Sequence, residues 1–213
     1  MKQNLFFTAL LFTMSTITFS QNLVTFGVRG GLNMANLSMN LPSNLWPADN
    51  QKKSRTSFNL GVYGQYSLNE KIALQAELFY SGEGANFTDP GTELPAHIKL
   101  SYLSLPIFFK YNIVKNFYAM AGPQFSYLLA AHSIYENGNS YNVLSEHNKI
   151  DVGLVPVIGY DWKQFSINLR YHIGLSKLPN SHSYWSYSPY SDDKVKSNVF
   201  SVVVSYKVFG VKE

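Results

Sequence analysis

The stretch YLSLPIFFKY, Tyr102–Tyr111, alternates residue by residue between two kinds of side chain, and this alternation decides the fold. The apolar face consists of Leu103, Leu105, Ile107, Phe109 and Tyr111. The mixed face consists of Tyr102, Ser104, Pro106, Phe108 and Lys110. A soluble core strand rarely carries such a lysine, and a membrane-spanning helix needs about 20 apolar residues. The period of two therefore predicts a β-strand with one apolar and one mixed face.

The same alternation recurs along the chain. In 165–175 the apolar residues Phe165, Ile167 and Leu169 alternate with Ser166 and Asn168. This period predicts eight strands. They cover 23–33, 55–68, 71–85, 98–112, 116–131, 149–162, 164–175 and 196–209.

The connections between these strands alternate in length. The long connections are 34–54, 86–97, 132–148 and 177–195, and the three others are a few residues long. Bacterial outer-membrane barrels have an even number of antiparallel strands, short periplasmic turns and longer outer loops. The sequence therefore predicts an all-β fold, an eight-stranded antiparallel up-and-down transmembrane β-barrel.

A soluble lipocalin-like barrel is the alternative, and it would carry its apolar face inside. The position of the aromatic residues favours the membrane barrel, because membrane barrels have aromatic girdles at the lipid interfaces. Near the short turns the apolar face carries Tyr66, Tyr111, Phe117, Tyr160, Trp162, Phe165 and Tyr206.

Composition narrows the function classes. Charged residues make up 14% of the 213 residues, against about 25% in ordinary soluble domains. The absence of cysteine excludes disulfides and thiolate metal sites, and the net charge of +4 is too scattered for a nucleic-acid surface. Lys2 and the apolar run Leu5–Met14 predict a signal peptide at 1–20, cleaved after Ser20, followed by one barrel domain at 21–213.

The mixed faces place charged and polar side chains in the lumen. Eight strands leave a lumen that side chains fill, so buried charges there should form pairs. We expect Lys110 to pair with Glu77 or Asp151. A narrow solute or ion pore is the alternative. The predicted interior network consists of Arg29, Glu77, Lys110, Gln124, Asp151, Arg170, His172 and Lys207.

Three prolines, Pro106, Pro123 and Pro156, fall inside predicted strands. Each removes one ladder hydrogen bond, which a bulge, a kink or water from the lumen would accommodate. We interpret them as features of shape.

The sequence predicts no enzyme, no catalytic residue, no metal and no cofactor. Its five histidines show no nucleophile-elbow or zinc-site spacing. An outer-membrane enzyme that modifies lipid or peptide is a further alternative.

The last long connection contains SHSYWSYSPYSDD, Ser181–Asp193, which is dense in rigid aromatic residues. Tyr184, Trp185, Tyr187 and Tyr190 form a candidate contact loop. The alternative is that these aromatics pack on the barrel rim or on lipid headgroups.

Four stretches resemble strands of one known family. They are FGVRGGLNMANL (26–37), YLSLPIFFKY (102–111), AGPQFSYLLAA (121–131) and INLRYHIGLSKL (167–178). In this order they resemble the first, fourth, fifth and seventh strands of the PorT-type outer-membrane β-barrel family of Bacteroidota, a porin-like family. The resemblance implies a barrel and a link to protein secretion, which is the role of the member that gives the family its name.

We therefore expect a bacterial outer-membrane protein with a structural or interaction role through its long outer loops. The expected partners are outer-membrane lipid and other envelope or secretion proteins, and nucleic acid is not among them.

Overall fold

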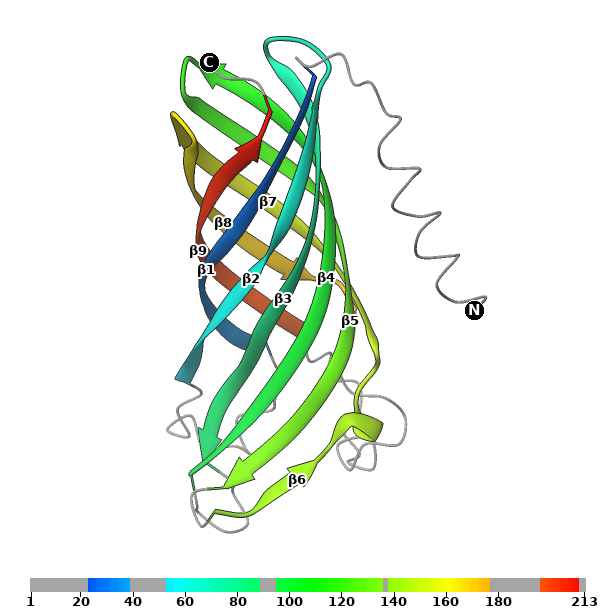
Figure 1. Cartoon of the computed structure of the whole chain (residues 1–213). Coiled ribbons are helices and arrows are strands. Elements are labelled where there is room, and N and C mark those ends of the chain that lie inside the picture. Colours follow the sequence, from blue (N-terminus) through cyan, green and yellow to red (C-terminus); the bar gives the residue numbers. More distant parts are fainter. Residues whose placement is uncertain (1–22, 39–52, 89–94, 136–137, 177–195, 211–213) are drawn as a thin grey trace, which may run out of the picture.

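A computed structural model describes residues 23–38, 53–88, 95–135, 138–176 and 196–210. Eight long strands form one antiparallel sheet that closes into a barrel (Figure 1). They are β1 (Val24–Ser38), β2 (Lys53–Ser67), β3 (Ile72–Thr88), β4 (Pro95–Val114), β5 (Phe117–Tyr135), β7 (Ile150–Trp162), β8 (Phe165–Gly174) and β9 (Lys196–Phe209). The predicted fold class is confirmed, with strand ends shifted by a few residues.

The barrel closes between its first and last strands. β1 pairs with β2 on one side, from Val24↔Tyr66 onward, and with β9 on the other, as far as Ser38↔Lys196. The tight turns lie together at one end of the barrel, at the top of Figure 1, and we call it the turn end.

Local chemistry fixes the tight turns. Between β2 and β3 the Asn69 carboxamide oxygen accepts hydrogen bonds from the backbone N–H groups of Lys71 and Ile72, at 2.9 and 2.8 Å. Between β7 and β8, Lys163 adopts a φ of 56°, the left-handed conformation that two-residue hairpin turns need. These turns keep successive strands adjacent in the sheet.

The third of the long predicted connections, 132–148, contains structure that the sequence analysis missed. A short strand, β6 (Ser140–Asn142), pairs with the outer part of β5, and one 3-10 turn covers Leu144–Glu146. Three residues are too few for the period of two to be recognised.

Within the described residues, no helix has the length and apolar character needed to cross a membrane.

The apolar faces point outward and the polar faces point into the lumen. Leu105 and Phe109 are 43% and 50% exposed on the outside, whereas the inward Arg29 and Glu77 are 2% and 3% exposed. A soluble lipocalin-like barrel would carry its apolar face inside. The observed arrangement excludes that alternative.

The predicted aromatic girdle surrounds the turn end on the outer surface. Phe117 packs on Tyr160 of the neighbouring strand with ring centroids 4.8 Å apart, and Phe165 packs on Tyr206 at 5.1 Å. The Trp162 ring lies 6.5 Å from that of Phe165. Such a ring of amphipathic side chains marks a membrane–water interface.

The strand prolines interrupt the ladders without shifting the register, so of the three accommodations that the sequence left open, a bulge does not occur at these positions. Pro106 points into the lumen, and Pro123 and Pro156 point outward. Because proline lacks an N–H, the pairing skips two residue pairs beside each one. The gaps lie between Ala76↔Ile107 and Phe79↔Ser104, between Pro106↔Gln124 and Phe109↔Ala121, and between Leu154↔Ile173 and Val157↔Arg170.

Leu105→Arg tests the direction of the outer face. Leu105 lies between Tyr111 of the girdle and Ser101, so arginine there would place a charge deep in lipid and cost about 2–4 kcal/mol. The free energy of unfolding in liposomes, from urea titration, measures this cost. The matched control is Leu68→Arg beside the turn, where the expected cost is about 0–1 kcal/mol. Equal costs at both depths would contradict the assignment of this face to lipid.

Candidate functional site

The centre of the lumen is built around the carboxylate of Glu77 on β3. Arg170 of β8 donates two hydrogen bonds to it, at 2.8 and 3.3 Å, and Arg29 of β1 forms a second ion pair with it. Gln75 donates a further hydrogen bond at 2.8 Å. All four side chains are buried, so each charge depends on its partners in place of water.

This ion-pair cluster continues across the lumen through amides and hydroxyls. The Arg29 guanidinium donates to Asn59 at 2.7 Å, and Asn59 donates to Asn33. Asn33 donates to Ser81 at 3.0 Å and accepts from Ser201 at 2.9 Å. Side chains from β1, β2, β3, β8 and β9 thus form one connected polar band, which we call the central band.

The central band ends at Glu83 on the outer side. Ser81 and Ser197 donate hydrogen bonds to the Glu83 carboxylate at 3.2 and 2.6 Å. The void among these side chains measures only about 10 Å³, which is about the space that one water molecule needs.

Aromatic rings fill the lumen beside the charges. The Arg29 guanidinium lies 3.9 Å from the centroid of the Phe79 ring, and that of Arg170 lies 5.6 Å from the centroid of Phe108. Sequence analysis treated the inward face as polar and missed these cation–π contacts. Phe108 belongs to an inward apolar cluster with Tyr118, Met120, Val155 and Val157.

A second apolar cluster fills the outer part of the lumen. It consists of Ala85, Leu100, Tyr102, Leu128 and Ala131. Val143 and Leu144, which follow β6, pack against it, and the Val143 backbone N–H donates to the Ala131 carbonyl at 3.0 Å. We call this the outer cluster.

Three of the predicted network residues lie in the lumen beside the central band. The His172 imidazole Nε2 lies 3.5 Å from an Asp151 carboxylate oxygen. Gln124 donates to the Ser126 hydroxyl at 3.1 Å. Among the predicted residues, the structure joins Glu77 to Arg29 and Arg170 in ion pairs and brings His172 close to Asp151.

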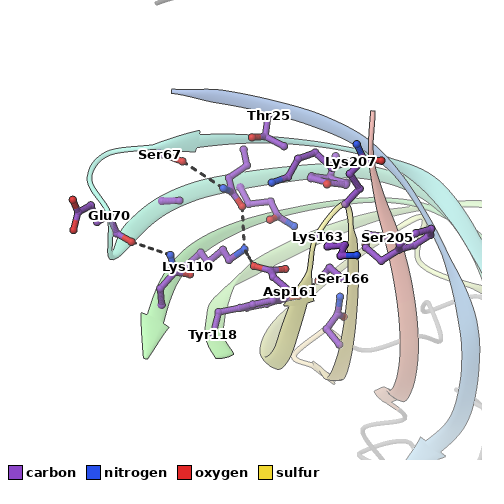
Figure 2. A pocket seen from close by; sticks show the side chains of 18 of the residues that line it. Thr25, Ser67, Glu70, Lys110, Tyr118, Asp161, Lys163, Ser166, Ser205 and Lys207 are labelled. Atoms are coloured by element: carbon purple, nitrogen blue, oxygen red, sulfur yellow. Dashed lines mark hydrogen bonds and ion pairs between the residues drawn. The ribbon is translucent and has the colours of Figure 1, made fainter. Parts of the chain in front are cut away.

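The expected partner of Lys110 was wrong. Its ammonium group pairs with Asp161 at 2.9 Å, not with Glu77 or Asp151, and also donates to Gln65 at 3.2 Å (Figure 2). Asp161 lies on the same inward parity of β7 as Asp151, so the alternation could have identified it.

Lys110 and Lys207 line a cavity of about 490 Å³ at the turn end, which we call the turn-end cavity (Figure 2). Its inner limit includes Gln75 and Asn168, which hydrogen bond Glu77 and Arg170. The cavity therefore ends where the central band begins.

Two tyrosines lie against the wall and leave this cavity open. A Cβ on Gly27 would come within 2.4 Å of the Tyr63 ring, and a Cβ on Gly159 within 2.3 Å of the Tyr118 ring. Each ring thus covers a glycine of a neighbouring strand and does not extend across the lumen. The Tyr118 hydroxyl and the Ser166 hydroxyl, 2.7 Å apart, hold one of them in place.

The candidate contact loop, with Tyr184, Trp185, Tyr187 and Tyr190, lies outside the described residues.

An apolar outer face, an aromatic girdle and a polar lumen together define a transmembrane β-barrel. The model of the family described as outer membrane protein beta-barrel domain matches residues 19–180, and the chain belongs to this family. Its location is the bacterial outer membrane, as the sequence predicted. Barrels of this class have short periplasmic turns, so we expect the turn end to face the periplasm.

Several solved outer-membrane proteins are similar to this chain at low sequence identity. Neisserial surface protein A is 14% identical, with 86% of this chain and 98% of that chain covered and a TM-score of 0.50. The attachment invasion locus protein Ail of Yersinia pestis, solved with the heparin analogue sucrose octasulfate, is 15% identical, with 87% and 99% covered and a TM-score of 0.47. OprG of Pseudomonas aeruginosa is 12% identical, with 89% and 98% covered and a TM-score of 0.44. A comparison with curated proteins finds no match.

Proposed function

We propose that this protein is a non-conducting, non-enzymatic barrel that presents an interaction surface on the outside of the cell. The observation that carries the proposal is the filled lumen. The central band crosses it from Glu77 to Glu83, and the outer cluster fills the part beyond. A wide aqueous channel needs about 16 strands, twice the number in this barrel.

The outer part of β3, β4 and β5 supports a surface role. The apolar outer face of β4 ends at Leu103, and the next outward residues toward the outer end are Ser101 and Lys99. The ladder between β4 and β5 continues beyond this point to Ala96↔Tyr135. This part of the sheet rises above the lipid band, and the residues after β6 brace it from inside. Sites on rigid sheet are held more precisely than sites on free loops, so this outer sheet is a suitable support for an interaction surface.

Conductance in planar bilayers tests the filled lumen. The purified barrel is expected to give no unitary current steps, because the void within the central band measures only about 10 Å³. The positive control is a porin of about 16 strands, which conducts under the same conditions. Stepwise current from the unmodified barrel, lost on chemical crosslinking of the lumen, would overturn the proposal.

Membership of the PorT-type group and the link to secretion stay predictions. The four stretches that carry the resemblance fall mainly in β1, β4, β5 and β8, which are wall strands. Wall strands specify a fold and do not identify a partner.

A further inference from the structure

Basic side chains gather on the outward face of β4 toward the end opposite the turn end, at the bottom of Figure 1. Lys99 is exposed there, and its partner across the ladder to β5 is His132. The adjacent pair, Leu100 and Ala131, belongs to the inward outer cluster, so Lys99 and His132 point outward by alternation. His97 lies two positions beyond Lys99 on β4 and therefore shares this face.

A further cation reaches this face from β2. The Arg55 guanidinium donates to the Glu83 carbonyl at 3.0 Å, and its Nη1 lies 3.5 Å from the point that a Cβ on Gly84 would occupy. Gly84 is the ladder partner of Lys99. Burial lowers the pKa of the His97 imidazole, and the charges of Lys99 and Arg55 lower it further, so both cations lie close to it. We call Arg55, His97, Lys99 and His132 the basic patch.

Within the described strands β2 to β5, no carboxylate on the outer wall balances this charge. β2, β4 and β5 contain no Asp or Glu, and the two acids of β3, Glu77 and Glu83, are buried in the lumen. In the part of the chain that the structure describes, the side chains of Lys99, His97 and His132 form no ion pair or hydrogen bond. Like charges on directly opposed strand residues repel each other, so an anion bound between them would stabilise the patch.

The height of the basic patch matches that of lipid headgroups. At a rise of about 3.3 Å per residue and a tilt of about 40°, Lys99 lies about 30 Å from Tyr111 of the girdle along the barrel axis. The apolar band of an outer-membrane barrel is about 25 Å tall. Tyr80 marks the outer edge of this band, because its ring packs on the outward Phe58 at 5.5 Å and its hydroxyl lies 2.9 Å from that of Ser101. The patch follows just beyond this edge.

The wall beside Lys99 is open to a headgroup. Gly84 lies opposite Lys99, and the next outward position of β3 toward the lipid is Gly82. A headgroup can therefore approach the backbone between Arg55 and Lys99. Toward the turn end the outward face of β4 becomes apolar at Leu103, which suits the acyl chains of the same molecule. The surface thus changes from cations to hydrocarbon in the same direction as a lipid does.

We propose that the basic patch binds the phosphate of a lipid headgroup in the outer leaflet. Lys99 and Arg55 neutralise the phosphate, and the two imidazoles donate hydrogen bonds to its oxygens. The expected orientation, with the turn end toward the periplasm, places the patch at this leaflet. The lipid lies below the outer sheet that supports the proposed interaction surface, so either proposal can fail without the other.

Native mass spectrometry of the full chain, released from uncharged micelles, measures this binding. The probes are lipid A with its phosphates, dephosphorylated lipid A and inorganic phosphate. We expect phosphorylated lipid A to bind about tenfold or more tightly than the dephosphorylated form, since one charge-assisted hydrogen bond accounts for such a factor. Equal binding of the two forms would overturn the proposal. Inorganic phosphate that displaces lipid A at equal concentration would also overturn it, because the patch would then be an ion site and not a lipid site.

Lys99→Gln tests the patch itself. The substitution removes one charge at an exposed position and should lower the affinity for phosphorylated lipid A about three- to tenfold. The affinity for dephosphorylated lipid A should stay within about twofold. The matched control is Lys115→Gln, which makes the same change of charge at the exposed turn between β4 and β5. It should leave both affinities within about twofold, because exposed charges beyond a Debye length of about 10 Å are screened. A Lys99→Gln barrel that shows the folded mobility on gels and binds phosphorylated lipid A as tightly as the parent would contradict the assignment.

Discussion

Replacement of Glu77 by alanine is expected to destabilise the barrel by about 3–5 kcal/mol. The substitution leaves the guanidinium groups of Arg29 and Arg170 buried beside each other without their shared carboxylate. An uncompensated buried charge is far more costly than the loss of an exposed ion pair. Urea unfolding in micelles, followed by the mobility difference between folded and unfolded protein on gels, measures the change.

Two further variants test whether the cost comes from the unpaired buried charges. Glu70→Gln removes an exposed carboxylate from the neighbouring turn and should change the free energy of unfolding by less than about 0.5 kcal/mol. The triple variant Arg29→Met, Glu77→Leu, Arg170→Met removes all the charges together and should recover most of the stability. A Glu77→Ala barrel as stable as the parent would show that water reaches the two arginines, and the lumen would then not be filled.

Gly122→Ala is expected to destabilise the barrel by about 3 kcal/mol or more, or to prevent its assembly. A Cβ at this position would lie 1.8 Å from the carbonyl oxygen of Ile107 and 3.0 Å from the Cα of Phe108, both on β4. These are backbone atoms, so no change of rotamer can relieve the clash. Gly122 lies where the ladder between β4 and β5 is interrupted, and the two strands approach closely there.

The folded fraction recovered after dilution from urea into micelles reports on this variant. Ala121→Leu is the matched control. It adds atoms at the preceding residue of β5, whose side chain points outward to the lipid. It should fold as well as the parent. Normal folding of Gly122→Ala would show that β4 and β5 separate at the interruption more easily than their contact indicates.

The alternation predicted the fold because it contains two pieces of information at once. A period of two identifies a strand, and the parity of each residue identifies its face. Arg29, Glu77 and Arg170 were therefore assigned to the lumen without knowledge of the strand register. The tight turns and the aromatic girdle added direction, because both gather at one end of the barrel.

The partners inside the lumen could not be predicted in the same way. Which carboxylate meets Lys110 depends on the stagger of strands that are not neighbours, since β5 lies between β4 and β7. The parity of a residue shows whether its side chain points inward, but not at which height along the barrel axis the side chain lies. The turn-end cavity was missed for a related reason, because it results from the packing of two tyrosines on glycines of neighbouring strands.

The pairing of β1 with β9 has a consequence for how the chain folds. The other ladders of the barrel join neighbouring segments of the chain, whereas this one joins Phe26 to Phe209. Closing so long a loop is slow, because its entropy must be lost before the contacts form. Until then the sheet has two open edges, each a template for pairing with another chain. The last ladder to form thus decides between a finished barrel and an aggregate.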